Sequence, residues 1–248
     1  MDITPWELTW IEPFGLRILE PVTAFTDLIT ASICFYAFWY LSRLKRPQAL
    51  HQFFRAYFLF MGCATVFAGL IGHAFLHFLT PSWKMIGWTC SSLAIYMIER
   101  STLEVMKTHL GPRITRVMKG LVLLQWLIFF SCILYPDPAT RGFHMVKINS
   151  TIGLVGVVLP LQFWHWMLTR DKGSQWVVTS IVCSLLPAIT YNFEISLATW
   201  FNYHDVSHVL MAGCTFLMFV GAFHLKQETT PGAFNPFGLR TDNYQHSQ

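Results

Sequence analysis

The sequence predicts an all-α, multi-pass membrane protein with seven transmembrane helices. Of its 248 residues, 54% are hydrophobic and 12% are charged, whereas soluble domains carry about 25% charged residues. The mean hydropathy is +0.44, and the apolar residues fall into long runs near the ~20 residues that cross a bilayer core. Because lipid cannot hydrogen-bond a bare backbone, we expect each run to be a helix.

Seven apolar runs fill most of the chain. They cover residues 21–41, 53–79, 83–106, 117–135, 145–168, 175–198 and 206–225. Pro160 and Pro187 lie inside the fifth and sixth runs, where a membrane helix accommodates proline as a kink. We therefore expect a seven-helix membrane domain over residues 1–226, followed by a polar, disordered cytoplasmic tail over residues 227–248.

Positive charge alternates between the connections and predicts the orientation. Basic residues gather where runs one and two, three and four, and five and six meet: Arg43, Lys45, Arg46, Arg55, Lys107, Arg113, Arg116, Lys119, Arg170 and Lys172. Since positively charged loops stay in the cytoplasm, the N-terminus is expected outside or in a lumen and the C-terminus inside. The net charge of +4 is therefore a topology signal, and the expected partner is the lipid bilayer, not nucleic acid.

Four histidines form two pairs inside the apolar runs. His73 and His77 stand near the end of the second run, and His204 and His208 stand at the start of the seventh. Spacing of i, i+4 stacks two side chains on one helix face. Ionisable residues inside membrane segments are costly and by default mark a functional site. Two such pairs on facing helices could supply three or four nitrogen ligands to one metal ion.

The direction of the helices brings further polar residues to these pairs. In an up-and-down bundle, odd-numbered helices start on the side where even-numbered helices end. Asp27 lies early in the first run, and Asn192 and Glu194 lie late in the sixth. We therefore expect these residues and the histidine pairs in one leaflet, which is the outer or lumenal one in the orientation predicted above.

Other ionisable residues have a structural interpretation. Glu99 and Glu104, beside Arg100 late in the third run, are interpreted as interfacial or helix-end charges. The remaining histidines are interpreted as amphipathic anchors or hydrogen-bonded packing residues. They are His51, His109, His144, His165, His224 and His246.

Four short segments follow a known order along the chain. Residues 18–28 join a glutamate to Thr-Asp, residues 69–77 end in histidine, Asn192-Phe193-Glu194 follows, and residues 204–208 read HDVSH. In these segments the chain resembles the alkaline ceramidase and progestin/adiponectin receptor superfamily. That group consists of seven-helix membrane proteins regarded as zinc-dependent amide hydrolases.

The resemblance implies a zinc site and a reaction. His77, His204 and His208 would be the zinc ligands, and a water would occupy the fourth position. Zinc acidifies such a water toward neutral pH, so that hydroxide can attack an amide carbonyl. The sequence departs from the family pattern at two places, because His73 replaces a serine and no aspartate occurs in residues 88–91.

The expected function is metal-dependent hydrolysis of a lipid amide or ester, with zinc as cofactor and a membrane lipid as substrate. Asp27, Asp205 or Glu194 would accept the proton of the attacking water. His73 would be a fourth ligand, an oxyanion donor or a neighbour of the ligands. Two alternatives stay open: a receptor or binding protein without catalysis, and a redox protein whose histidines ligate iron or haem. A bacterial inner membrane and a eukaryotic endomembrane both fit the composition.

Overall fold

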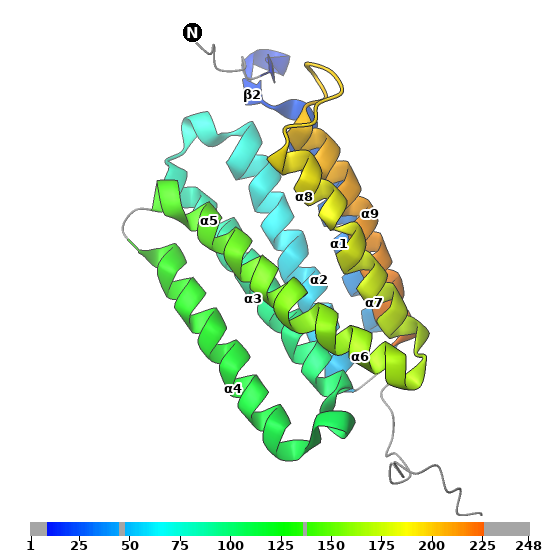
Figure 1. The fold of residues 1–248 in the computed structure, drawn as a ribbon. Coiled ribbons are helices and arrows are strands. Elements are labelled where there is room, and N and C mark those ends of the chain that lie inside the picture. Colours follow the sequence, from blue (N-terminus) through cyan, green and yellow to red (C-terminus); the bar gives the residue numbers. More distant parts are fainter. Residues whose placement is uncertain (1–8, 45–47, 136–137, 226–248) are drawn as a thin grey trace, which may run out of the picture.

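The computed structural model describes residues 9–44, 48–135 and 138–225. Over these residues the chain forms seven helical rods that run up and down, with one two-stranded hairpin ahead of the first rod (Figure 1). The predicted all-α fold of seven helices is confirmed. The expected tail over residues 227–248 lies outside the described residues.

The rods differ in how continuous they are. Three are single helices: α1 (Pro21–Arg43), α3 (Lys84–Val105) and α9 (Tyr203–His224). The rod α4 (Lys107–Leu134) is kinked near its start at Gly111, whose φ of 74° is not helical and which Pro112 follows. The second rod is α2 (Ala49–Phe67), continued by a π-helical segment (Ala68–Ala74). The fifth joins α5 (Pro138–Thr151), a π-helical segment (Ile152–Val158) and α6 (Leu159–Thr169). The sixth joins α7 (Lys172–Cys183) and α8 (Leu185–Asn192).

A small hairpin precedes α1. Strand β1 (Trp10–Ile11) pairs antiparallel with β2 (Ile18–Leu19) across a 3-10 turn (Pro13–Gly15). We call the end of the bundle at which α1 and α9 begin, and which carries this hairpin, the upper end, as drawn in Figure 1. The opposite end, at which α1 and α9 finish, is the lower end. An odd number of rods places the hairpin and the end of α9 at opposite ends.

The two expected proline positions coincide with interruptions of the helices. Pro187 lies in α8, three residues after the break at Ser184. Because proline has no N–H, the carbonyl of Cys183 receives no helical hydrogen bond from it. Pro160 is the second residue of α6, which directly follows the π-helical segment Ile152–Val158. Both rods therefore cross the bundle with a change of helical pattern at the proline.

Two helices end earlier than the apolar runs predict. The second rod finishes at Ala74 instead of residue 79, after a stretch weakened by Gly69 and Gly72, which are poor helix formers. The sixth rod finishes at Asn192 instead of residue 198, because Glu194 takes a left-handed conformation with φ 51° that ends a helix.

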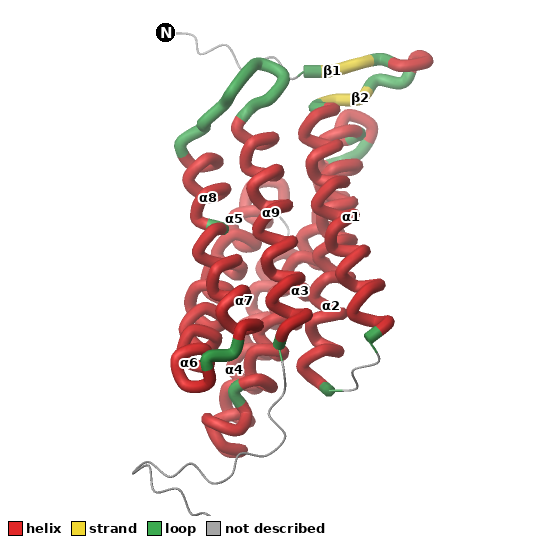
Figure 2. Tube along the Cα trace, turned by 90° about the vertical axis from the view of Figure 1, so that its right-hand side faces the viewer, coloured by secondary structure: helices red, strands yellow, loops and turns green. Residues whose placement is uncertain are grey.

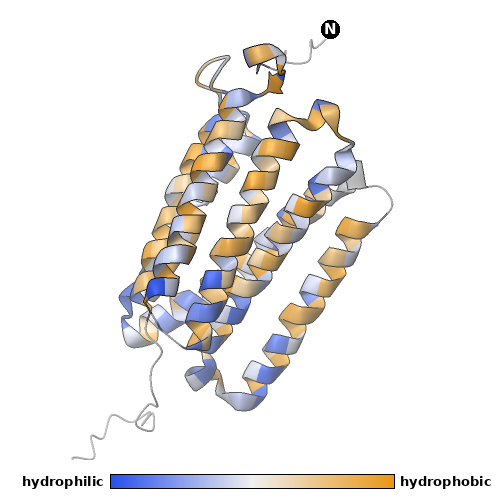
Figure 3. Cartoon of the chain, turned by 180° about the vertical axis from the view of Figure 1, so that it is seen from behind, coloured by the Kyte–Doolittle hydropathy of each residue, from blue (hydrophilic) through white to orange (hydrophobic). Residues whose placement is uncertain are grey.

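Six of the seven rods are long and apolar enough to cross a membrane, which makes this a multi-pass integral membrane protein. The remaining rod is α3, whose hydropathy is lowered by Lys84, Glu99, Arg100 and Glu104. Hydrophobic residues cover the rods, and polar residues gather at the lower end (Figure 3).

Glu99 and Glu104 are interpreted from the sequence as interfacial or helix-end charges. Glu104 does lie in the last turn of α3, but neither carboxylate is exposed, because both side chains are buried between helices. Glu99 is 1% exposed and accepts a hydrogen bond of 3.0 Å from the amide of Gln125 on α4. The same amide donates to Asn149 on α5 at 3.3 Å. Glu104 is paired with Lys119 on α4. Helix α3 therefore directs its carboxylates toward α4 and α5.

Helices α7 and α9 pack backbone against backbone at two glycines. A Cβ on Gly221 would lie 2.9 Å from the backbone nitrogen of Val177, and one on Gly173 would lie 2.5 Å from the Cα of Leu225. Small residues let membrane helices approach this closely. The contact fixes the lower half of α9 against the sixth rod.

We expect Gly221→Ala to lower the free energy of unfolding by about 1–3 kcal/mol, because the added methyl group meets backbone atoms that cannot move aside. Gly213→Ala on the same helix is the matched control, since a Cβ there meets nothing within 4 Å. Thermal unfolding in detergent measures both variants. Equal melting temperatures for the two variants would contradict this account of the α7–α9 contact.

Candidate metal centre

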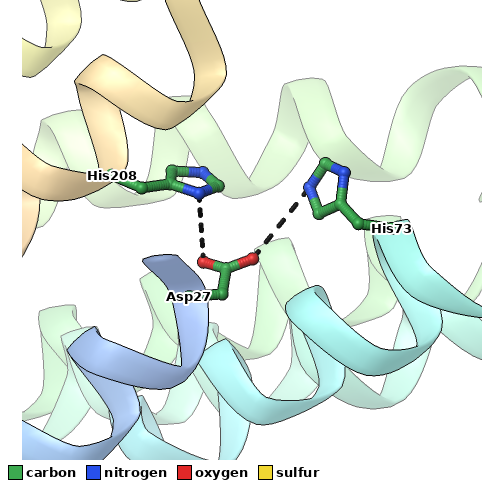
Figure 4. Close-up of side chains that lie close together, drawn as sticks. All are labelled: Asp27, His73 and His208. Carbon is green, nitrogen blue, oxygen red and sulfur yellow. Dashed lines mark ion pairs between the residues drawn. The ribbon is translucent and has the colours of Figure 1, made fainter. Parts of the chain in front are cut away.

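Three side chains from three rods converge at the upper end of the bundle. They are Asp27 on α1, His73 in the π-helical segment after α2, and His208 on α9, and one ligand atom of each lies within 4.8 Å of the others. Both imidazoles face the carboxylate, one toward each oxygen (Figure 4). Nδ1 of His208 lies 3.4 Å from Oδ1 of Asp27, and Nε2 of His73 lies 4.0 Å from Oδ2. These residues, which we call the Asp–His group, could hold a metal ion.

The carboxylate of Asp27 is the most deeply buried member of this group. Its residue is 3% exposed, and within the described chain Oδ2 accepts no hydrogen bond. A buried carboxylate without a partner is costly, and a bound cation removes that cost. The donor set of one carboxylate and two imidazoles suits zinc and the other divalent transition metals.

Asp27 and His73 meet because the π-helical segment after α2 approaches α1 closely at Gly69, which has no side chain. A Cβ on Gly69 would lie 2.9 Å from the carbonyl oxygen of Ala24 and 3.0 Å from Cβ of Asp27. Gly69 belongs to the π-helical segment that ends with His73 and Ala74. Segments of this kind occur frequently at functional sites, since the extra residue per turn changes the direction in which side chains point.

A carboxylate from outside the bundle orients His73. Oε2 of Glu20 lies 2.9 Å from Nδ1 of His73. Glu20 follows β2 directly and donates its backbone N–H to the carbonyl of Thr9 at 2.8 Å, so the hairpin holds it in place. Because a carboxylate only accepts hydrogen bonds, Nδ1 carries the proton and Nε2 keeps its lone pair toward Asp27. That tautomer is the one a metal ligand needs.

The charge of Glu20 is maintained by its neighbours. Burial raises the pKa of its carboxyl group, but the hydrogen bond from His73, together with favourable electrostatics from His73, His204 and Lys84, holds that pKa below its usual range. Glu20 is therefore ionised at neutral pH and acts as a hydrogen-bond acceptor for His73.

The start of α9 is fastened to α1 by Asp205. One carboxylate oxygen accepts from the hydroxyl of Thr23 at 2.6 Å, and the other accepts from the backbone N–H of Asn202 at 2.8 Å. The side chain of Asn202 accepts in turn from the backbone N–H of His204, which completes the cap. His208, three residues after Asp205, faces Thr26 on α1, with 3.4 Å between its Nδ1 and the hydroxyl oxygen of Thr26.

His204 lies beside the Asp–His group without belonging to it. The centre of its ring is 5.8 Å from that of His73 and 6.5 Å from that of His208. On its other side it contacts the rings of Tyr191 and Tyr203.

The expectation that His73 and His77 share one helix face is wrong. The helix has ended at Ala74, and His77 lies in a 3-10 turn (Leu76–Phe78) where its ring contacts Phe78 at 3.9 Å between centres. The side chain of His77 is exposed. Of the ligands that the resemblance implies, His208 is in the group, His204 is adjacent to it and His77 is outside it.

The other sequence-predicted residues lie at the same end of the bundle. Glu194 and Asn192 are exposed at the end of α8, and Asp205 is buried with both oxygens hydrogen-bonded. Sequence reasoning did not place Glu20 or the two threonines of α1 at the site. The helix-direction argument could have included Glu20, because it stands one residue before α1.

One of the histidines interpreted as packing residues shows that role directly. His165 is buried, and its Nδ1 lies 2.7 Å from the hydroxyl oxygen of Ser174, which joins α6 to α7. Its ring also contacts that of His109, with 5.6 Å between centres. These residues belong to the lower end and are separate from the Asp–His group.

Comparison with known proteins assigns the chain to a family but does not assign an activity. Residues 22–227 match DUF6962, a family of unknown function, and this stretch contains all three residues of the Asp–His group. No curated protein and no solved structure matches the chain. The resemblance to the alkaline ceramidases therefore rests on the four short segments alone.

We expect Glu20→Gln to weaken zinc binding about 10- to 100-fold, because a neutral amide supports His73 less well than a carboxylate does. Zinc titration by isothermal calorimetry measures the change. Glu12→Gln removes an exposed charge from the same hairpin and serves as the control. Equal zinc affinity in both variants would show that Glu20 does not support a metal ligand.

Proposed function

We propose that this protein is a metal-dependent hydrolase, with zinc as the metal, that cleaves an amide or ester bond of a membrane lipid. The chain belongs to DUF6962, a family of unknown function, so the proposal is made from the site. One observation carries the proposal. The Asp–His group gathers a carboxylate and two imidazoles from three separate rods at one end of a membrane bundle, with their ligand atoms within 4.8 Å of one another. A purely structural bundle would have no use for so costly an arrangement.

The donor set supports an open, catalytic site. Catalytic zinc sites commonly use three protein ligands, among them two histidines and a carboxylate, and leave the fourth position to water. Zinc at this position would lower the pKa of its water to about 7 and polarise a carbonyl group. Asp27 and the two histidines would hold the ion, and Glu20 would fix the ring of His73 through the 2.9 Å hydrogen bond.

The carboxylates have different roles in this proposal. Asp27 is a ligand, and Asp205 anchors α9, since its two oxygens already accept hydrogen bonds. Glu194 is exposed at the same end of the bundle and is the remaining candidate for accepting the proton of the attacking water. His204, beside the ligands, would donate a hydrogen bond to the oxyanion that develops on the carbonyl.

The ceramidase-like interpretation keeps one ligand, His208, and changes two, because His204 lies beside the Asp–His group and Asp27 takes a ligand position. In the resemblance, the donors come from the second and last helices, and here His73 replaces His77 as the donor of the second rod while Asp27 adds one from the first. The seven-helix arrangement and the HxxxH at the start of α9 support the kinship. The substitution of His73 for the family serine supports a site whose ligand set differs from that of the ceramidases.

We extend the proposal to all seven rods as membrane spans. Helix α3 has 22 residues, enough to cross a bilayer core, and its carboxylates face α4 and α5 instead of lipid. The basic residues at the lower end, among them Arg43, Lys107 and Arg170, support a cytoplasmic position for that end. The Asp–His group would then lie in the outer or lumenal leaflet.

A redox function is the second candidate, because the same donor set also occurs in non-haem iron proteins. Two histidines and one carboxylate with open positions form the ligand set of Fe(II) oxygenases. The metal present in the purified protein decides between the two readings. A metal-holding receptor without catalysis would bind the ion and turn over no lipid.

We expect about one zinc per chain in protein purified in detergent without chelators, measured by inductively coupled plasma mass spectrometry. His73→Ala, His208→Ala and Asp27→Ala should each lose the metal, since each removes one ligand of three. His77→Ala and Lys84→Ala should keep it. Loss of zinc in His77→Ala together with its retention in His73→Ala would favour the ligand set of the ceramidases.

The catalytic half of the proposal is tested with lipid substrates. We expect the zinc-loaded protein in nanodiscs to release fatty acid from ceramides or from another lipid amide or ester, as detected by mass spectrometry. Asp27→Asn should reduce release to the background rate, because it removes the anionic ligand, and Lys84→Ala should not. Iron in place of zinc, or zinc without turnover of any lipid, would contradict the hydrolase.

A further inference from the structure

The upper end of the bundle exposes large apolar side chains that no part of the described chain covers. In the β1–β2 hairpin, Trp10, Ile11, Phe14 and Leu16 are all exposed, and Phe14 at the tip is completely so. Phe14 and Gly15 have positive φ values of 54° and 77°, which turn the chain back and present Phe14 outward. The hairpin thus carries a fully exposed phenylalanine at its tip.

Both side chains of β1 are exposed, although they point to opposite faces of the hairpin. Trp10 and Ile11 are 47% and 41% exposed. An isolated two-stranded hairpin is marginally stable at best in water. The hairpin projects sideways beyond α1 instead of continuing along the bundle axis (Figure 2). The hairpin therefore extends over the surroundings of α1 and not over the bundle itself.

The other upper connections have the same character. Phe78 and Trp83 are exposed between α2 and α3, and Phe193, Leu197 and Trp200 are exposed between α8 and α9. The lower connections are different, because no large hydrophobic side chain is exposed in their described residues. Basic residues lie in these connections or next to them: Lys107, Arg170 and Lys172. The apolar rim therefore belongs to one end of the molecule, the end with the Asp–His group.

Lipid is the occupant that fits this rim, because the rim continues a surface that lipid already covers. Phe25 and Ile29 follow the hairpin in the sequence, on the first turns of the membrane-spanning helix α1, and both are exposed. Aromatic side chains collect at the boundary between acyl chains and headgroups. Arg17 stacks over the ring of Trp10, with 4.7 Å from its guanidinium carbon to the ring centre, and so carries a phosphate-binding group beside the apolar residues.

We propose that the hairpin lies in the surface plane of the bilayer, with Phe14 and Leu16 among the acyl chains and Arg17 at the headgroup phosphates. The partner is the lipid leaflet itself. The contact reaches the candidate site, because the residue after β2 is Glu20, which is tied to Thr9 and hydrogen-bonds His73. Lipid that holds the hairpin also holds Glu20 against the metal ligand.

This surface also indicates the class of substrate, a step that rests on the hydrolase function proposed above. The Asp–His group lies in the second turns of α1 and α9, and so just below the headgroup phosphates at which the proposal puts Arg17. A bond cleaved there lies where the headgroup joins the acyl chains. The substrate would therefore be an amphipathic lipid whose amide or ester stands at that junction, taken sideways from the leaflet.

Insertion of the hairpin is tested by fluorescence quenching, independently of activity. Phe14→Cys is labelled with the dye NBD and reconstituted in phosphatidylcholine vesicles, with wild-type protein as the labelling blank for the six native cysteines. Lipids that carry a doxyl quencher near the headgroup should quench the dye, and aqueous iodide should not. Thr108→Cys at the lower end is the control, because its side chain is exposed among basic residues and should show the reverse.

Each other outcome overturns the proposal. Iodide quenching at position 14 as strong as at position 108 means that the hairpin stands in water. Protection that depends on the protein-to-lipid ratio means that a second copy of the chain covers Phe14. For the substrate step, Phe14→Asp should raise KM about tenfold for a lipid in vesicles and leave a short-chain soluble analogue unchanged. No turnover of either substrate refutes the hydrolase alone, while the quenching result still decides on the hairpin.

Discussion

The buried carboxylate of Asp27 is the constraint on which the rest of the upper end depends. An anion 3% exposed inside a membrane protein must be compensated, and the chain brings two imidazoles to it from opposite sides. Gly69 makes room for the approach of the second rod. Thr23 and Asp205 hold the last helix against α1 on the other side.

The two ends of the bundle solve different physical problems. At the lower end and in the interior, the carboxylates of α3 have direct partners: Lys119 pairs with Glu104, and the amide of Gln125 donates a hydrogen bond to Glu99. At the upper end, one oxygen of Asp27 has no such partner in the described chain, and two histidine nitrogens point toward the same space. A charge network that is complete stabilises helix packing, whereas one that lacks a cation at its centre is suited to binding one.

Much of the site was accessible from the sequence because helix direction is a simple constraint. Alternating rods bring the start of the first helix, the end of the second and the start of the last to one side, which predicted Asp27, His73 and His208 as neighbours. The error concerned His77, because the i, i+4 rule assumes that a helix continues, and here it ends three residues earlier at Ala74. Glu20 was missed because its role comes from a turn of the hairpin, and no periodicity records such a turn.

The sequence by itself determined the all-α membrane class, the number of helices and the end of the bundle at which polar chemistry collects. These follow from composition and from run length, since a bilayer imposes both on any chain that crosses it. Only the tertiary structure decided which donors meet, that α3 turns its carboxylates inward, and that the hairpin extends sideways with its apolar residues uncovered. Those outcomes depend on helix rotation, on close contacts at Gly69 and Gly221 and on where each helix stops, and these are properties of packing between segments far apart in the chain.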